Sequence, residues 1–121
     1  QETILLVEDE GIILNMASQM LEHLGYHVLK AKTAADAIHH AKEHSEKIHL
    51  LLTDVIMPEM NGKNLAEKIK THCPEIKVMF MSGYTANVIA HHGVLDEGVN
   101  FIQKPFVIKE LGKRVRKALD S

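Results

Sequence analysis

Short apolar runs alternate with longer stretches of helical periodicity along this chain of 121 residues. Five of these runs have the length and composition of β-strands. They cover residues 3–7, 27–31, 49–53, 77–81 and 100–103. Strands that alternate with helices favour right-handed βαβ units and a parallel sheet with helices on both faces. The pattern therefore predicts an α/β protein with a doubly wound, five-stranded parallel sheet.

The stretches between the runs carry apolar side chains every three or four residues, which is typical of amphipathic helices. The faces expected to be buried are Ile12, Ile13, Met16, Met20, Leu21 and Leu24; Ala34, Ala37, Ile38 and Ala41; Leu65, Ala66, Ile69 and Cys73; and Leu111, Val115, Ala118 and Leu119. A further helix near residues 86–92 is expected to be short, because Gly93 and Gly98 interrupt its pattern.

Strand composition also predicts the order of the strands. A central parallel strand is buried on both faces and is apolar throughout, whereas an edge strand can mix polar and apolar residues. The first, third and fourth runs are continuously apolar, while the second and fifth are mixed. The second and fifth strands are therefore expected at the edges, in the order 2-1-3-4-5. In such sheets, ligands bind beyond the C-terminal ends of the strands, here above strands one and three.

Composition narrows the class of protein. A chain of this length with 45% hydrophobic residues is expected to form one domain, residues 1–121. Its 14 basic and 16 acidic residues give a net charge of −2, which argues against direct contact with nucleic acid. Cys73 is the only cysteine, which favours a reducing compartment, and we expect the cytoplasm. The apolar runs are far shorter than the roughly 20 residues of a membrane helix, so no direct membrane contact is expected.

Polar side chains follow the predicted strands at their C-terminal ends. Glu8 and Asp9 follow the first strand, Asp54 the third, Ser82 the fourth and Lys104 the fifth. At about 4 Å, two like charges repel by roughly 4 kcal/mol at an effective dielectric near 20, so three carboxylates require a raised pKa or a bound cation. Mg²⁺ suits hard oxygen ligands, and Mn²⁺ is a possible substitute. Lys104 would add positive charge opposite the carboxylates.

Each of these residues also has an ordinary structural interpretation. Asp9 could cap the helix that follows it, and Asp54 could open a turn that continues to Pro58. Ser82 could lie in a loop, and Lys104 could be a solvated side chain. The joint placement of all four at one edge of the sheet is what favours a functional site.

In their sequence context, these residues resemble the receiver domains of bacterial two-component response regulators. Segments 4–10, 52–62, 81–84 and 101–106 are similar to the family's signatures, and the resemblance covers the whole chain. It implies a flavodoxin-like (βα)5 fold. It also implies that Asp54 takes a phosphoryl group from a phosphohistidine on a sensor histidine kinase or a histidine phosphotransfer domain. The region from Ser82 to residue 106 most resembles the receivers of hybrid sensor histidine kinases.

The resemblance assigns roles to the polar residues. Glu8, Asp9, Asp54 and the backbone carbonyl of Ile56 would hold Mg²⁺. Lys104 would neutralise charge on the phosphoryl oxygens during transfer. Glu8 stands where the family more commonly has aspartate, so its longer side chain is expected to bind the ion more loosely than Asp9 does.

The same resemblance implies a conformational switch. Ser82 would hydrogen-bond the attached phosphoryl group, and Phe101 would pack inward in response, with a phosphorylation-dependent dimer as one possible output. Phe101 lacks the hydroxyl of the more common tyrosine. Ile56 and Tyr84 occupy positions that often carry polar groups able to align a hydrolytic water, so a long-lived phosphoaspartate is expected. Such a domain promotes its own phosphotransfer but is not a turnover enzyme, although a longer parent could be a hybrid histidine kinase.

Other interpretations fit less well. A pseudo-receiver, which keeps the fold as an interaction module without phosphorylation, is the main alternative. An aspartyl phosphatase would carry a second acid at the position of Ile56, and no complete glycine-rich nucleotide motif is present. His40 and His44 lie one helical turn apart, and residues 91–92 are also histidines, but a solvated helix face is a better interpretation than a metal site.

Overall fold

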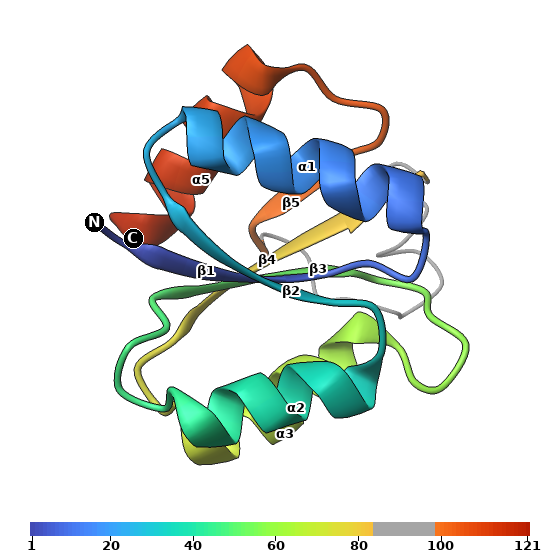
Figure 1. The fold of residues 1–121 in the computed structure, drawn as a ribbon, viewed down its shortest axis with the longest axis vertical. Helices are drawn as coiled ribbons and strands as arrows, with labels where there is room; N and C mark the ends of the chain where they lie inside the picture. The colour runs from blue at the N-terminus through green and yellow to red at the C-terminus, as the bar shows by residue number, and fades with distance from the viewer. Residues whose placement is uncertain (84–98) are drawn as a thin grey trace.

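The computed structural model describes residues 1–83 and 99–121, and its elements alternate between strand and helix (Figure 1). In chain order they are β1 (Thr3–Val7), α1 (Gly11–His23), β2 (His27–Ala31), α2 (Ala34–Glu43), β3 (Leu50–Asp54), α3 (Gly62–His72), β4 (Lys77–Ser82), β5 (Phe101–Gln103) and α5 (Ile108–Leu119). The helix expected near residues 86–92 lies outside the described residues.

The five strands form one parallel sheet in the order β2-β1-β3-β4-β5, which confirms the predicted fold class and strand order. The two strands of mixed composition, β2 and β5, lie at the edges. Four strand boundaries differ from the prediction by one residue: β3 and β5 begin one residue later, and β3 and β4 end one residue later, at Asp54 and Ser82. Asp54 and Ser82 are therefore the last residues of their strands, held in the sheet itself.

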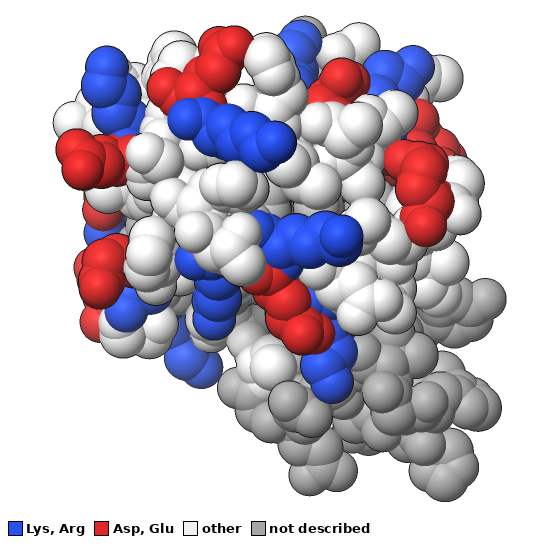
Figure 2. Space-filling view, turned by 90° about the horizontal axis from the view of Figure 1, so that it is seen from below, with Lys and Arg blue, Asp and Glu red and all other residues white. Residues whose placement is uncertain are grey.

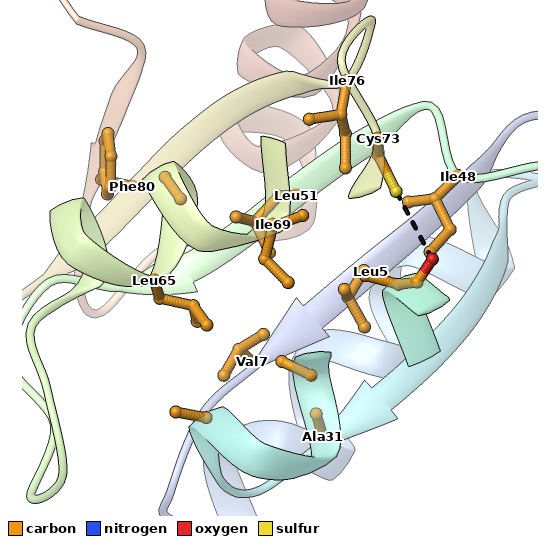
Figure 3. Close-up of a cluster of buried hydrophobic side chains, with 14 of the residues drawn as sticks. Leu5, Val7, Ala31, Ile48, Leu51, Leu65, Ile69, Cys73, Ile76 and Phe80 are labelled. Atoms are coloured by element: carbon orange, nitrogen blue, oxygen red, sulfur yellow. Dashed lines mark hydrogen bonds between the residues drawn. The ribbon is translucent and has the colours of Figure 1, made fainter. Parts of the chain in front are cut away.

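Helices cover both faces of the sheet, with α1 and α5 on one face and α2 and α3 on the other (Figure 1). Successive residues of β3 point to opposite faces: Leu51 packs in the cluster with α2 and α3, whereas Leu52 packs in the cluster with α1 and α5. Figure 3 shows the first cluster, in which the buried Cys73 thiol donates to the Ala41 carbonyl oxygen at 3.7 Å. The sheet is thus rigidly packed between two apolar layers.

The buried face of α1 differs from the predicted one. Leu14, Ala17 and Leu21 are buried, and of these only Leu21 was predicted. Ile12, Met16 and Leu24 are 86%, 41% and 38% exposed, so the expectation that these three are core residues was wrong. Both sets of residues recur with helical periodicity, and periodicity alone could not choose between them. Leu14, Ala17 and Leu21 pack in the apolar cluster beneath α1, while Ile12 remains at the surface.

Side-chain capping bonds mark where α2 and α3 begin. Thr33 accepts the Asp36 backbone N–H at 3.1 Å at the start of α2, and Asn61 accepts the Asn64 N–H at 2.8 Å at the start of α3. Gly25 ends the first helix with a φ of 98°, a conformation that favours glycine. Among the described residues, no helix has both the length and the apolar character needed to cross a bilayer.

Candidate functional site

The parallel register brings the predicted polar residues to one edge of the sheet. Asp54 pairs with Met81, one residue before Ser82, and Ser82 pairs with Gln103, one residue before Lys104. The Lys104 N–H donates to the Ser82 carbonyl oxygen at 2.7 Å, so the backbone pairing continues past β5. The C-terminal ends of β3, β4 and β5 therefore meet.

Lys104 joins two of the carboxylates directly. Its Nζ lies 3.0 Å from Glu8 Oε2 and 3.3 Å from Asp54 Oδ2. The Lys104 side chain is only 16% exposed, and Glu8 and Asp54 are buried. The interpretation of Lys104 as a solvated side chain is therefore wrong. Its ammonium contacts two buried carboxylates, of which its single charge can balance one.

The ordinary interpretations of the aspartates also fail. The residue that precedes α1 as its N-cap is Glu10, which makes no side-chain capping bond, so Asp9 is not the helix cap. Asp54 is a buried strand residue, and the following Val55 N–H still bonds to the Met81 carbonyl oxygen of β4 at 3.0 Å. Asp54 therefore belongs to the sheet and not to the turn that follows it.

Glu8, Asp9 and Asp54 form the only group of three or more potential metal-binding side chains within residues 1–83 and 99–121. One ligand atom from each lies within 4.8 Å of the others. Three carboxylates face the single ammonium of Lys104, which leaves two negative charges for a cation to balance. Hard oxygen donors and this charge fit a divalent cation such as Mg²⁺.

The contacts of Glu8 distinguish it from Asp9. Glu8 Oε2 bonds to Lys104, and its Oε1 accepts the backbone N–H of Glu10 at 3.3 Å. Both Glu8 oxygens thus have a hydrogen-bond partner, and Asp9 is the more exposed of the two acids. That Glu8 binds a metal ion more loosely than Asp9 stays a prediction.

Burial shifts the proton affinities within the site. Removal from water raises the pKa of Glu8 and of Asp54, more than their bonds to Lys104 lower it. Burial alone would lower the pKa of Lys104, but its hydrogen bond to Glu8 and the charge of Asp54 raise that pKa overall. The ammonium therefore stays charged, while the carboxylates favour a proton or a cation beside them.

The segment after β3 is held closely against Asp54. The Gly62 N–H donates to the Val55 carbonyl oxygen at 2.6 Å, and a Cβ added to Gly62 would collide with the Asp54 carbonyl oxygen. Between the buried Val55 and Met57, the Ile56 side chain is 53% exposed. The role of the Ile56 carbonyl as a metal ligand stays a prediction.

The two predicted switch residues are both buried. Ser82 is the last residue of β4, not a loop residue, and Phe101 packs in the same apolar cluster as Phe80, its partner in the neighbouring strand. Tyr84, which the prediction of a long-lived phosphoaspartate also used, lies outside the described residues.

The histidines of α2 form no metal group of three or more ligands within the described chain. The rings of His40 and His44 lie with their centroids 6.2 Å apart, and His40 Nε2 is 3.1 Å from the Lys30 carbonyl oxygen. The histidines at residues 91–92 lie outside the described residues. A helix-surface role remains the better interpretation of His40 and His44.

Two contacts near the site involve residues that the sequence did not single out. Glu59 Oε1 accepts the Ala34 backbone N–H at 3.2 Å, and this bond ties the segment after β3 to the start of α2. Arg114 Nη1 donates to the Phe101 carbonyl oxygen at 3.0 Å. No local pattern joins Glu59 to Ala34. The spacing of Glu110 and Arg114 could have indicated their ion pair, but not the bond to β5.

Comparisons with known proteins agree with this geometry. The family model described as "Response regulator receiver domain" matches residues 4–116. The sensor kinase CckA of Brucella abortus is 33% identical over 98% of this chain, which spans 12% of that protein's length. The response regulator receiver protein CpdR of Brucella abortus is 34% identical over 96% of this chain and 95% of its own length.

A solved structure agrees in both sequence and fold. The crystal structure of the receiver domain from the hybrid histidine kinase CckA superimposes with a TM-score of 0.81 and 38% identity, covering 97% of this chain and 98% of that one. The sheet order, the residues at the strand ends and the family match over nearly the whole chain lead to one conclusion. The chain belongs to the family of response regulator receiver domains of two-component systems.

Proposed function

We propose that this chain is a phosphoacceptor, in which Asp54 takes a phosphoryl group from a phosphohistidine in the presence of Mg²⁺. The observation that carries the proposal is the contact of Lys104 with both Asp54 and Glu8, within a group of three carboxylates that has two uncompensated negative charges. A buried group of carboxylates destabilises the fold, because each carboxylate loses hydration. Binding of a cation or a phosphoryl group gives such a group a function. The donor would be a sensor histidine kinase or a histidine phosphotransfer domain.

In the proposed reaction, an Asp54 carboxylate oxygen attacks the phosphorus, the P–N bond to the donor histidine breaks, and the imidazole leaves and takes up a proton. Asp9, Glu8 and Asp54 would hold Mg²⁺ with the Ile56 carbonyl, and the ion would neutralise charge on the phosphoryl oxygens. Lys104, already 3.3 Å from Asp54, would exchange its carboxylate contact for a phosphoryl oxygen. Positioning and charge balance supply most of the catalysis.

Incubation with Mg²⁺ and acetyl phosphate tests the proposal without a partner protein. Intact-mass measurement should detect one added phosphoryl group on the wild type and none on Asp54→Asn. Asp36→Asn, which alters an exposed carboxylate of α2, is the matched control and should be modified like the wild type. An unmodified wild-type protein would favour the alternative, a pseudo-receiver that acts as an interaction module.

The donor protein would approach an apolar surface beside the site. Ile12 and Val107 are 86% and 65% exposed, and a shallow cavity of about 250 Å³ lies between α1 and the segment before α5. Its lining residues are Ile13, Met16, Lys104, Pro105 and Phe106. Exposed apolar side chains of this kind mark interaction surfaces when they gather beside a reactive group.

A surface substitution separates docking from chemistry. We expect Ile12→Asp to slow phosphotransfer from a phosphorylated histidine phosphotransfer domain by tenfold or more, on the order of the 1–2 kcal/mol that an interface anchor contributes. Modification by acetyl phosphate should be unchanged, because Ile12 is 86% exposed and is not part of the carboxylate group. The control is Glu22→Gln, which changes an exposed residue of α1. A control at Ile38 is unsuitable because that residue is partly buried. Equal slowing with both donors would contradict a docking role.

The setting of the domain is also part of the proposal. We propose that residues 1–121 form one cytoplasmic domain of a hybrid sensor histidine kinase. The likeness to the sensor kinase CckA supports this setting. Phosphorylation-dependent dimerisation is tested by light scattering with and without Mg²⁺ and acetyl phosphate. Loss of the phosphoryl group over hours and not minutes would support a long-lived phosphoaspartate.

Direct binding of nucleic acid is not part of the proposal. The face formed by α2 and α3 carries basic and acidic side chains in an interspersed pattern (Figure 2). The chain as a whole has a net charge of −2. Neither property favours contact with a phosphate backbone, which requires a surface of concentrated positive charge.

A further inference from the structure

β5 is a strand of three residues with a polar contact at each end. Lys104, directly after the strand, bonds to Glu8 and Asp54 in the candidate site. Phe101, the first residue of the strand, has its carbonyl oxygen held by Arg114 of α5 at 3.0 Å. This short strand therefore joins the phosphoacceptor to a helix that contributes no side chain to the carboxylate group.

The direction of the Phe101 carbonyl explains why it needs this partner. The preceding Asn100 carbonyl oxygen accepts the Phe80 N–H at 2.9 Å and so faces β4. Successive carbonyls of a strand point to opposite sides, so the Phe101 carbonyl faces the outer edge of the sheet. Arg114 supplies a charged donor for a backbone group that β4 cannot reach.

Arg114 is itself held on the surface of α5. Its Nε lies 2.9 Å from Glu110 Oε1, one helical turn earlier, and both side chains are about half exposed. Glutamate four residues before arginine is the favourable order for such a pair. A change in the position of the Phe101 carbonyl would therefore alter an ion pair that solvent and partners can reach.

The Phe101 side chain adds a second link to the site. It is buried in the cluster that also contains Phe80 and Val55, and Val55 directly follows Asp54 in the chain. The Phe101 side chain thus lies in the apolar layer that also holds the residue after the phosphoacceptor, while its carbonyl bonds to α5. Through its side chain and its main chain, Phe101 lies between these two regions.

We infer that Arg114 is a positioning residue that couples the phosphorylation state of Asp54 to the exposed surface of α5. The inference rests on the proposed phosphoacceptor function. A phosphoryl group on Asp54 offers Lys104 new oxygen partners, and a shift of Lys104 is carried along β5 to the Phe101 carbonyl. Arg114 then changes its bond to Phe101 and its pairing with Glu110. In this inference β5 has two positions, and both phosphorylation of Asp54 and the contacts of Arg114 on α5 shift the balance between them.

Amide shifts in two regions test this coupling. The ¹⁵N-labelled chain of residues 1–121 is treated with Mg²⁺ and beryllofluoride, a mimic of a carboxylate-bound phosphoryl group. In the wild type, we expect shifts both at the site, for Val55 and Lys104, and in the last two turns of α5. In Arg114→Ala, the site shifts should persist while the α5 shifts fall by about half or more, as expected for loss of a coupling contact.

Three further variants sharpen the test. Arg114→Lys keeps a charged donor and should recover part of the α5 response. Glu110→Gln removes the ion pair but leaves the Phe101 bond, so its α5 response should stay close to that of the wild type. Arg114→Gln is read in the same way as Arg114→Ala and replaces it if the alanine variant does not fold.

The possible results separate the inference from the proposed function. Undiminished α5 shifts in Arg114→Ala and Arg114→Gln would overturn the inference, even if both variants melt at a lower temperature, because Arg114 would then only hold the edge strand. Absence of site shifts in the wild type would instead contradict the phosphoacceptor proposal.

Discussion

Lys104 lies between the carboxylates of Glu8 and Asp54. Because the contact is largely buried, solvent screens it less than it screens an exposed ion pair. The ammonium cannot neutralise two buried carboxylates and Asp9 as well. Loss of hydration is the main cause of the raised pKa of Glu8 and of Asp54, and a neighbouring carboxylate raises each pKa further. At the scale of single residues, the site is therefore held in a state that favours uptake of a cation.

The raised pKa of Asp54 predicts how stability depends on pH without metal. The folded chain keeps its proton to a higher pH than the unfolded chain, so stability falls as pH rises above the ordinary pKa of about 4. Asparagine resembles the protonated form and leaves Lys104 paired with Glu8. In EDTA at pH 7, Asp54→Asn should melt at a higher temperature than the wild type, and the difference should shrink towards pH 4.

Thermal unfolding followed by circular dichroism between pH 4 and pH 8 measures this difference. Glu22→Gln, which removes an exposed carboxylate of α1, is the control and should follow the wild type. A lower melting temperature for Asp54→Asn at pH 7 would mean that the Lys104 contact stabilises the fold more than the buried charge destabilises it.

The elements around the site are positioned by close backbone packing as well as by side chains. α3 begins at Gly62, whose N–H bonds to Val55 and whose missing side chain leaves room for the Asp54 carbonyl. Asn–Gly pairs are common in turns, but here the Asn61 side chain caps the start of α3. The start of α3 is thus fitted to the end of β3 at the site.

Substitution of Gly62 tests this fit. In Gly62→Ala, the new Cβ would collide with the Asp54 carbonyl oxygen and lie 3.2 Å from Thr53 Cγ2 and Val55 Cα. We expect a loss of about 1–3 kcal/mol in the free energy of unfolding, as for other overpacked sites. If Asp54 is the phosphoacceptor as proposed, its labelling by acetyl phosphate should slow as well, because the strand that carries Asp54 must shift. Denaturant unfolding gives the first quantity and intact-mass kinetics the second.

Gly112→Ala is the matched glycine control. Its Cβ would lie 3.1 Å from Leu24 Cδ2, the end of a flexible side chain that is 38% exposed and free to move. Alanine is favoured over glycine inside a helix by about 1 kcal/mol, so α5 should lose little stability or gain some. Equal destabilisation of both variants would show that the position of Gly62 beside Asp54 is not special.

At the scale of the whole molecule, one arginine of α5 joins the last helix to the residue before β1. Arg116 of α5 forms two bonds with Glu2, at 2.9 and 2.8 Å, and also contacts Asp120. The Glu2 carbonyl oxygen in turn accepts the His27 N–H at 3.0 Å, beside the start of β2. The ends of the chain and the edge strand therefore meet at the edge of the sheet opposite the site (Figure 1).

Arg116→Gln should loosen this edge without unfolding the protein. Solvent screens exposed ion pairs, so we expect only a small loss of thermal stability. This loss should disappear in 1 M salt, where the screening length is about 3 Å. Hydrogen exchange of the His27 amide should accelerate more than that of Leu52 in the central strand. Lys117→Gln, a neighbouring exposed residue of α5, is the control. Uniform acceleration at both amides would instead indicate global destabilisation.

The sequence by itself determined the fold class, the strand order and the end of the sheet at which the candidate residues lie. Continuous apolar runs require burial on both faces, and polar residues at the ends of parallel strands must meet at one edge. These are rules of chain geometry that hold before any side chain is placed. They predicted that Glu8, Asp9, Asp54, Ser82 and Lys104 belong to one end of the sheet.

Only the tertiary structure decided which side chains touch. Periodicity could not tell that Ile12 and Met16 are exposed, because a second helical stripe with the same spacing faces the sheet. The contact of Lys104 with Glu8 spans 96 residues, and that of Arg114 with Phe101 depends on which way one carbonyl points. Contacts between segments distant in the chain depend on packing and backbone direction, which no local pattern encodes.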